Sequence, residues 1–392
     1  MLRSLFSSIS GLRVHQRMMD VTANNIANVN TTGFKSSQTV FEDTLSQLLT
    51  AAGAPQGGTG GTNPAQVGLG VRLAGIEPNF LQGAAQTTGR NTDLMIQGDG
   101  FFVVRHGGEQ LYTRNGSFSF DTNGRLVTGD GSVVQGWMGA AGAINTNGAV
   151  SDIQLPIGTL LPATPSSAVT VNGNLSADSA STAPITASIG GYDVQGNSLT
   201  LSATFTRLSP TSWSVSVSDG AGTTAVQQID FAANGSNPSP TTVTVGAITF
   251  DLSGITSYAG SSTVSAVQQN GAGMGSLQSF SITPDGTLVG VFSNGLKEPL
   301  AQLCTASFNN PPGLERVGDS MYRGTINSGA QQLGQPGSSG RGTLQGGALE
   351  MSNVDLAQEF TNLVIAQRGF EANSKVITTS DELLQDLVNL KR

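Results

Sequence analysis

Residues 349–388 read LEMSNVDLAQEFTNLVIAQRGFEANSKVITTSDELLQDLV, a stretch without proline. Apolar residues recur in it every seven positions, at Leu349, Leu356, Leu363, Phe370, Ile377 and Leu384. A heptad repeat puts its apolar side chains on one face, so the stretch predicts a long C-terminal helix. The companion row is mixed (Asn353, Phe360, Gln367, Ser374, Asp381 and Val388). Such a row favours packing in an array of several helices over a simple two-stranded zipper.

The N-terminal segment carries a related pattern. From Leu2 to about Asn28 there is no proline, and Gly11 is the only glycine. Apolar residues follow two heptad rows, which are Leu2, Ile9 and Ala23, and Leu5, Leu12, Met19 and Ile26. The segment predicts a helix with a narrow apolar seam, ended by an asparagine-rich run before Gly33. Isolated helices with narrow apolar faces are marginal, so we expect both helices to need partners, and copies of the same chain are one source.

Between the two ends the apolar period changes to two. Short alternating runs at 101–104, 110–113, 117–120, 125–128 and 132–135 are separated by glycine-containing turn pairs, which predicts a β-meander. A similar pattern returns at 279–282, 287–292 and 299–308. Phe41, Leu45, Leu48 and Leu49 indicate a short helix, and the glycine-rich residues 51–70 indicate a flexible connector.

Residues 151–275 differ in composition from their flanks. They contain no lysine, and Arg207 is their single basic residue beside six aspartates. We interpret them as an inserted all-β domain, because its two ends can lie close together on a host sheet. The predicted fold is α+β and mainly β: residues 1–50 with 348–392 form a coiled-coil-like terminal domain of paired helices, 51–70 a connector, 71–150 with 276–347 a discontinuous β host domain, and 151–275 an inserted outer β-domain.

Composition disfavours several function classes. Lys plus Arg is 18 and Asp plus Glu is 26, so the net charge of −8 offers no basic field for nucleic acid or an anionic membrane. With two histidines and one cysteine, histidine-based metal sites and most catalytic triads are nearly excluded, and we expect no cofactor and no catalytic site. Serines and basic residues interrupt the first apolar run, so a cleavable signal peptide is not expected.

Two blocks of sequence resemble those of flagellar rod and hook proteins. The first is NNIANVNTTGFK at 24–35, with Asn24, Asn25, Asn28, Gly33 and Phe34. The second begins with LEMSNVDL at 349–356 and continues through QRGFEANSK at 367–375, with Asn353, Gln367, Arg368 and Asn373. The central YTRNGSF at 112–118 is similar as well. Within this family, the long insertion after Trp137 favours a hook protein over the shorter rod subunits.

The resemblance implies a self-assembling hollow helical tube with terminal helices inside, the β host domain around them and the inserted domain outermost. It implies a curved hook that couples rod to filament and transmits torque as a universal joint. Implied partners are copies of the chain, the rod, the hook–filament junction proteins, the hook cap and the export apparatus, with an extracellular location in the flagellum. A distal rod subunit, a secreted β-rich adhesin and, third, an enzyme acting on a surface polysaccharide remain as alternatives.

The two ends also differ in charge. The N-terminal arm carries Arg3, Arg13, Arg17 and Lys35. The C-terminal arm carries Glu350, Asp355, Glu359, Glu371, Asp381, Glu382 and Asp386. Two interpretations stay open, which are two solvated polar faces and pairing of the arms between neighbouring subunits.

Overall fold

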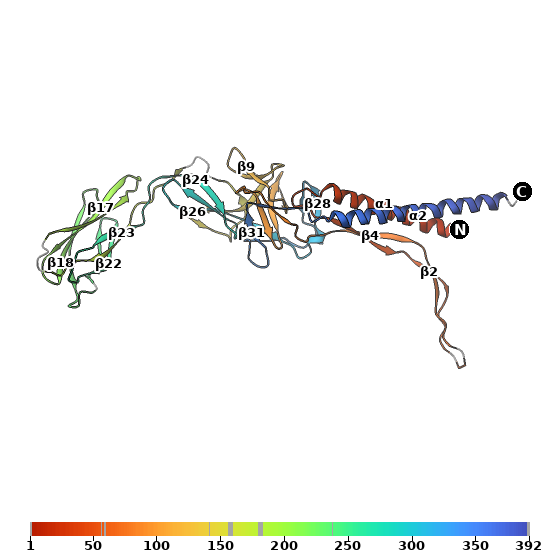
Figure 1. Ribbon diagram of the computed structural model, residues 1–392, viewed down its shortest axis with the longest axis horizontal. Helices are drawn as coiled ribbons and strands as arrows, with labels where there is room; N and C mark the ends of the chain where they lie inside the picture. Colours follow the sequence, from red (N-terminus) through yellow and green to blue (C-terminus); the bar gives the residue numbers. More distant parts are fainter. Residues whose placement is uncertain are drawn as a thin grey trace. The chain divides into compact units, whose positions relative to one another are not determined.

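The structure is a computed structural model, and it describes residues 2–55, 57–58, 60–140, 142–155, 160–178, 183–236 and 238–389 (Figure 1). The chain divides into two compact units. The first contains residues 1–155, 281–289 and 299–392, and the second contains residues 156–280 and 290–298. The expectation of a mainly β chain with a helix near each end is confirmed. The discontinuous host domain and the inserted outer domain remain predictions.

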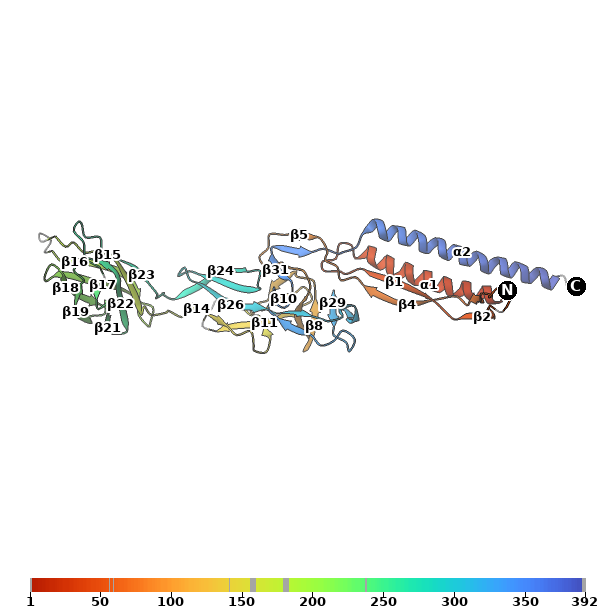
Figure 2. The same ribbon diagram turned by 90° about the horizontal axis from the view of Figure 1, so that it is seen from below.

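The two terminal helices, α1 (Leu2–Ala27) and α2 (Leu356–Asn389), lie side by side in the first unit (Figures 1 and 2). Asp355 caps α2, because its Oδ1 accepts hydrogen bonds from the backbone nitrogens of Ala357, at 2.9 Å, and Gln358, at 3.3 Å. The expectation that the helix includes Leu349 is wrong. That residue lies in strand β32 (Ala348–Glu350), which pairs with β5 (Ala85–Thr87) and so satisfies its backbone in a sheet.

A β-ribbon follows α1 where the sequence indicated a short helix and a connector. Strand β1 (Ser37–Asp43) pairs with β4 (Val71–Pro78), and β2 (Ser46–Thr50) pairs with β3 (Ala65–Gly68). Both expectations need correction, because Phe41 lies in β1, Leu48 and Leu49 lie in β2, and part of 51–70 is paired. Cross-strand pairing outweighs the spacing of four leucine and phenylalanine residues, which suits a helix only locally.

The rest of the first unit is a β-domain, whose main sheet has the order β26-β11-β7-β8-β29-β28. These strands are β7 (Phe101–His106), β8 (Glu109–Thr113), β11 (Val133–Ala140), β26 (Lys297–Leu303), β28 (Glu315–Gly318) and β29 (Met321–Arg323). Smaller elements are β6 (Leu94–Gln97), β9 (Phe118–Phe120), β10 (Leu126–Thr128), β12 (Ala143–Ile144), β13 (Ser151–Asp152), β25 (Thr287–Phe292), β27 (Thr305–Ser307), the 3-10 helix η1 (Pro311–Gly313), β30 (Gln332–Gly334) and β31 (Thr343–Gly346).

The expected strands of this domain are present, but their order is not that of a simple meander. Strand β8 pairs with β7 and with β29, from late in the chain, while β9 pairs with β10. The Asn115–Gly116 segment does not form a tight hairpin, because the Leu94 nitrogen donates a 3.0 Å hydrogen bond to the Gly116 carbonyl. The core holds edge-to-face aromatic pairs such as Tyr112 and Phe308, with ring centroids 4.7 Å apart.

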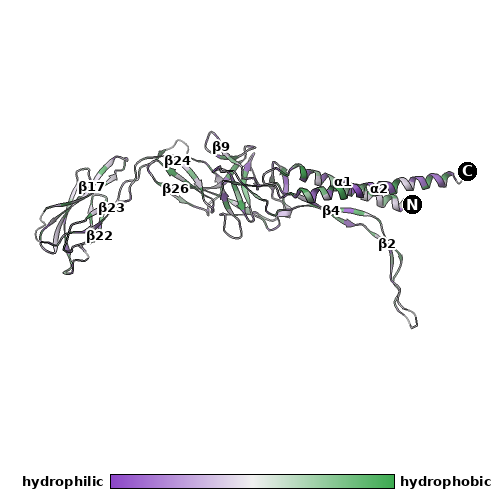
Figure 3. Cartoon of the chain, viewed as in Figure 1, coloured by the Kyte–Doolittle hydropathy of each residue, from purple (hydrophilic) through white to green (hydrophobic). Residues whose placement is uncertain are grey.

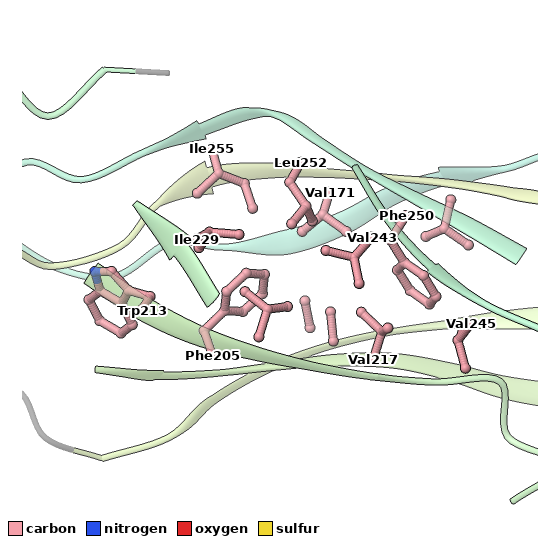
Figure 4. Packing of buried hydrophobic residues seen from close by; sticks show 14 of the residues in the cluster. Val171, Phe205, Trp213, Val217, Ile229, Val243, Val245, Phe250, Leu252 and Ile255 are labelled. Carbon is pink, nitrogen blue, oxygen red and sulfur yellow. The ribbon is translucent and has the colours of Figure 1, made fainter. Parts of the chain in front are cut away.

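The second unit contains two sheets around one core. The five-stranded sheet is β16 (Ile185–Tyr192), β17 (Ser198–Arg207), β18 (Ser212–Ser218), β19 (Thr224–Phe231) and β20 (Pro238–Ser239). The four-stranded sheet is β21 (Thr242–Val245), β22 (Ile248–Thr256), β15 (Ala168–Asn174) and β23 (Ser265–Gln269), and β14 (Leu160–Leu161) pairs with β24 (Gly275–Ile282). Phe205 and Trp213 from one sheet and Phe250 from the other are fully or almost fully buried (Figure 4). Alternating Ser and Val in β18 gives the buried face.

Candidate assembly interface

The two terminal helices run antiparallel, with small residues where they approach most closely. A Cβ atom on Gly11 would lie 2.8 Å from the side chain of Asn373, and one on Gly369 would lie 2.4 Å from the His15 ring. At the other end of the seam, the Asn25 amide donates a 3.0 Å hydrogen bond to Glu359. As the residue number rises along α1, the number of the residue that faces it on α2 falls by the same amount, so the register is regular along the helix pair. Glycine is required at both positions because any side chain would push the helices apart.

The residues buried in this seam are not those of the predicted apolar rows. In α1 the buried positions are Ser8, Gly11, Val14, Thr22 and Asn25. In α2 they are Glu359, Ala366 and Ser380. The predicted apolar rows therefore do not form the line of closest approach between these two helices, which the glycines set.

The predicted apolar positions flank the seam or face away from it. Half-buried positions are Leu5, Leu12, Met19, Ile26, Leu363, Ile377 and Leu384. Exposed positions are Ile9, Leu356 and Phe370. Leu2 lies in α1, and its side chain is not among those that the structure describes. The part that these residues take in assembly stays a prediction.

Other apolar side chains lie on the outer faces of α2. Phe360 is 53% exposed and Val364 52%, and these two residues continue the line of Leu356 at i, i+4 spacing. Ile365 and Val376 are also exposed. Figure 3 shows hydrophobic and hydrophilic residues interspersed along both helices. We call Leu356, Phe360, Val364 and Ile365 the outer stripe.

A buried ionic cluster joins the two sequence blocks at the base of the helices. Lys35 Nζ lies 2.6 Å from Glu350 Oε1, and both side chains are fully buried. Arg114 Nη1 lies 3.4 Å from Glu350 Oε2, and it is almost fully buried too. Lys35 also donates to the Leu81 carbonyl at 2.8 Å, and the Gly83 nitrogen donates to Glu350 at 2.9 Å. We call Lys35, Arg114 and Glu350 the junction cluster.

Burial lowers the pKa of both basic residues in the junction cluster. Desolvation lowers the Lys35 pKa, opposed by the adjacent Glu350 carboxylate and reinforced by the positive charge of Arg114. Desolvation also lowers the Arg114 pKa, opposed by Glu350 and by Asp99. Glu350 therefore compensates two buried cations. Pairing of Lys35 and Glu350 between subunits is excluded while this internal pair holds, which corrects that part of the intersubunit charge hypothesis.

The asparagines of the two blocks fasten backbone segments to each other. Asn25 bridges α1 to β1, because its amide donates to the Ser37 carbonyl at 2.7 Å and accepts from the Ser37 nitrogen at 2.9 Å. Asn353 accepts from the Ser36 nitrogen at 2.8 Å and donates to the Asn79 and Leu81 carbonyls at 2.8 and 3.1 Å. Both residues thus satisfy backbone groups at the start of β1 and just after β4.

Gly33 permits the close chain crossing beside the junction cluster. Its φ is +68°, and an added Cβ would lie 2.5 Å from the backbone nitrogen of Asn115. Its own nitrogen donates to the Glu350 carbonyl at 2.7 Å. The neighbouring Phe34 packs under Arg316, whose guanidinium lies 5.2 Å from the ring centroid.

The remaining motif residues lie on the helices or at their ends. Asn28 Nδ2 donates to the Asn24 carbonyl at 2.9 Å, which closes the last turn of α1. Gln367 and Arg368 are exposed on α2, and Arg368 pairs with Glu371 at 2.8 Å. Asn373 packs in the seam against Gly11. The structure thus divides the motif residues between the junction, the seam and the outer surface.

Family models for flagellar proteins match four parts of the chain. These are a flagella basal body rod protein model at residues 5–35, the flagellar hook protein FlgE/F/G D1 domain at 95–177, the flagellar basal body protein FlaE D2 domain at 160–272, and the flagellar basal body rod FlgEFG protein C-terminal model at 345–390. The first and last matches contain the seam glycines, and the last contains Glu350.

Relatives match over the whole length. The flagellar hook protein FlgE of Treponema pallidum is 38% identical, and the match covers 100% of each chain. This chain belongs to the flagellar hook protein family. It is a structural subunit of the flagellar hook. The flagellar basal-body rod protein FlgG of Bacillus subtilis is 34% identical, again over 100% of each chain. The crystal structure of Helicobacter pylori hook protein FlgE2 matches with a TM-score of 0.54 at 15% identity, covering 68% of this chain and 100% of that chain, and shows a shared fold.

The polar clusters of this hook-family chain have structural explanations. His106 Nδ1 lies 2.9 Å from Ser132 Oγ, and Ser132 donates to Asp130, but Ser132 is fully buried beside a turn that its own backbone closes. Within the residues that the structure describes, no three His, Cys, Asp or Glu side chains gather in a group suited to a metal ion. None of the described helices combines the length and the apolar character needed to cross a membrane.

Sequence reasoning missed two features of the interface. The seam glycines had a signal, because Gly11 and Gly369 are the only glycines within their helices. The junction cluster had a weaker one: its three residues lie in the three blocks that carry the family resemblance, but only the structure shows that they meet.

Proposed function

We propose that this hook-family chain polymerises with copies of itself into a curved, hollow helical tube whose innermost layer is the paired terminal helices. In this arrangement the β-domain of the first unit forms a discontinuous host domain around the helices. Residues 151–275 form an inserted outer domain at the tube surface. Support comes from the division of the chain into two compact units, the second of which contains residues 156–280.

The observation that carries this proposal is that the two helices pair through one kind of residue and expose another. Small and polar residues fill the seam within the chain, and the outer stripe of α2 stays exposed, with Phe360 at 53% and Val364 at 52%. Full burial of one such side chain contributes roughly 1.5–3 kcal/mol relative to full exposure. Burying the outer stripe against neighbouring copies therefore supplies several kcal/mol per subunit, enough to drive association of helices that are marginal alone.

Sedimentation velocity of purified chain tests the role of the stripe. Replacing Phe360 and Val364 by serine is expected to abolish the fast-sedimenting polymers formed at high salt and high protein concentration. The matched control is Ile326→Ser, because Ile326 is fully exposed in the same unit and belongs to neither helix. Polymers of unchanged size from the stripe variant would refute this part of the proposal.

The tube is proposed to couple rod to filament and to transmit torque as a universal joint, outside the cell. Its proposed neighbours are the flagellar rod and the hook–filament junction proteins, with the hook cap and export apparatus engaged during assembly. Support comes from the relatives, which include both hook and rod proteins.

The relatives also include a basal-body rod protein, so the shape of the assembled polymer is the test of the proposed curved tube. A rod requires straight, stiff polymers, and a hook requires curved ones. Electron micrographs of assembled chain distinguish the two by curvature, with curved tubes expected here. Deleting residues 151–275 tests where flexibility lies: if the outer domain sets the curvature, the shortened chain forms straight tubes.

A further inference from the structure

A groove of about 850 Å³ lies between α1 and strand β4. Its apolar floor includes Ile9, Val14 and Leu73, and Phe6 beside them is 68% exposed. An exposed phenylalanine over a hollow of this size leaves a large apolar surface in water.

The rim of this α1–β4 groove is basic. Arg13, Arg17 and Arg72 line it, and none of the described residues that line it carries a carboxylate. Arg17 lies 3.6 Å from Asp20, and Arg72 lies 2.6 Å from Glu42, so these two cations have surface partners. Within the described part of the chain, Arg13 has no ion pair. The groove thus offers an apolar floor and a net positive edge to an occupant.

The last turns of α2 have the complementary chemistry. By the register of the helix pair, in which Gly11 faces Asn373, residues after about Glu382 extend past Leu2, the first described residue of α1. This overhang, 383–389, exposes Leu383 at 55% and Val388 at 70%. The overhang contains one acidic residue, Asp386, and Asp381 and Glu382 come directly before the overhang. Residues 381–389 contain no basic residue. Lys391 and Arg392 follow outside the described residues.

We propose that the overhang of one copy docks into the α1–β4 groove of a second copy. Leu383 covers the apolar floor, and Asp386, three residues later on the same side of the helix, approaches Arg13 on the rim. Because α2 is one continuous helix that continues past α1, an overhang does not fold back onto its own groove (Figures 1 and 2).

This contact is directional. Each copy carries one groove and one overhang on different surfaces, so docking is heterologous and leaves a free groove at one end and a free overhang at the other. Such a contact propagates into a filament and does not close a two-fold dimer. The inference rests on the proposed polymerisation and specifies which surfaces meet.

A charge swap tests the docking. Arg13→Glu alone and Asp386→Arg alone are each expected to slow assembly about tenfold at low salt, because charges at an interface rim act mainly on association rate. The two changes together are expected to restore the rate. Lys297→Glu is the matched control, an exposed lysine far from both helices in sequence, with no expected effect. The rate differences shrink at high salt, where the screening length is short.

Cross-linking locates the contact independently. Ile9→Cys combined with Leu383→Cys is expected to give a ladder of oxidised oligomers from assembled chain, whereas Ile326→Cys with Leu383→Cys gives none. The native Cys304 is fully buried and does not interfere. If the wild-type chain assembles but Arg13→Glu assembles equally fast and the Ile9–Leu383 ladder is absent, the docking is wrong and polymerisation stands. If the wild-type chain does not assemble at all, the proposed function fails first.

Discussion

Replacing Glu350 by glutamine removes the carboxylate of the junction cluster while keeping the side-chain shape. Lys35 and Arg114 are then left as two buried cations without a carboxylate partner at 2.6 and 3.4 Å. Breaking a buried pair by removing one partner typically costs roughly 3–5 kcal/mol, because the remaining charge is uncompensated. With a urea m-value of about 2 kcal/mol/M, the midpoint of unfolding is expected to fall by roughly 2 M.

Lys35→Met is the informative partner variant. It leaves Glu350 and Arg114 as a neutral pair and removes the hydrogen bonds of Lys35 Nζ to Glu350 and to the Leu81 carbonyl. Losing such bonds to a charged group costs roughly 1–3 kcal/mol, so the loss is expected to be smaller than for Glu350→Gln. Glu371→Gln is the surface control, because its pair with Arg368 is well exposed and contributes under about 1 kcal/mol.

Tryptophan fluorescence measures the unfolding of the first unit separately from that of the second. The chain contains two tryptophans, Trp137 in the first unit and Trp213 in the second. In a Trp213→Phe background, the emission of Trp137 follows urea unfolding of the unit that holds the junction cluster. A loss for Glu350→Gln no larger than that for Lys35→Met would refute the reasoning that two buried cations depend on one carboxylate.

Three further outcomes follow from the same contacts. Gly369→Ala is expected to lower the helicity measured by far-UV circular dichroism, because the added Cβ would lie 2.4 Å from the His15 ring. In an isolated helix the same change normally stabilises by about 1 kcal/mol. A gain in helicity would therefore contradict the close approach at the seam. Gly33→Ala is expected to lower the free energy of unfolding, followed by Trp137 emission, by more than about 1 kcal/mol. The φ of Gly33 is +68°, and the added Cβ would contact backbone atoms. An unchanged urea midpoint would contradict this expectation. Burial raises the pKa of Cys304 to about 11 and that of Tyr112 to about 12. The stability that these two neutral groups contribute is therefore full below about pH 9 and is lost as pH rises toward 12. Cys304→Ala should flatten the lower part of that fall, as urea titrations at each pH will show.

The sequence predicted the two terminal helices and several strands of the β-domain, because each rests on a local period. The predicted runs at 101–104 and 287–292 lie in strands, and the N-terminal helix ends before Gly33, as spacing and backbone chemistry indicate. Elements that depend on pairing with a distant segment of the chain were harder to predict from the sequence. Phe41 and Leu48 are spaced as in a helix, yet 71–78 and 65–68 pair with their segments as strands. Heptad counting weighs apolar residues, so it did not locate the line of closest approach, where Gly11 and Gly369 leave room.

The junction cluster lay furthest from prediction. Lys35 and Glu350 are 315 residues apart, and each looked like an ordinary surface charge on its arm. Burial of both, together with Arg114, depends on the crossing at Gly33 and on the Leu81–Gly83 backbone, neither of which leaves a periodic signal.

The central claim is that the terminal helices build the inner wall of a tube made of this chain alone. Electron cryomicroscopy of purified full-length chain, assembled in precipitating salt, measures this directly. The predicted result is a hollow, curved polymer with α1 and α2 lining the channel. Persistent monomers, or polymers whose helices lie on the outer surface, would contradict it.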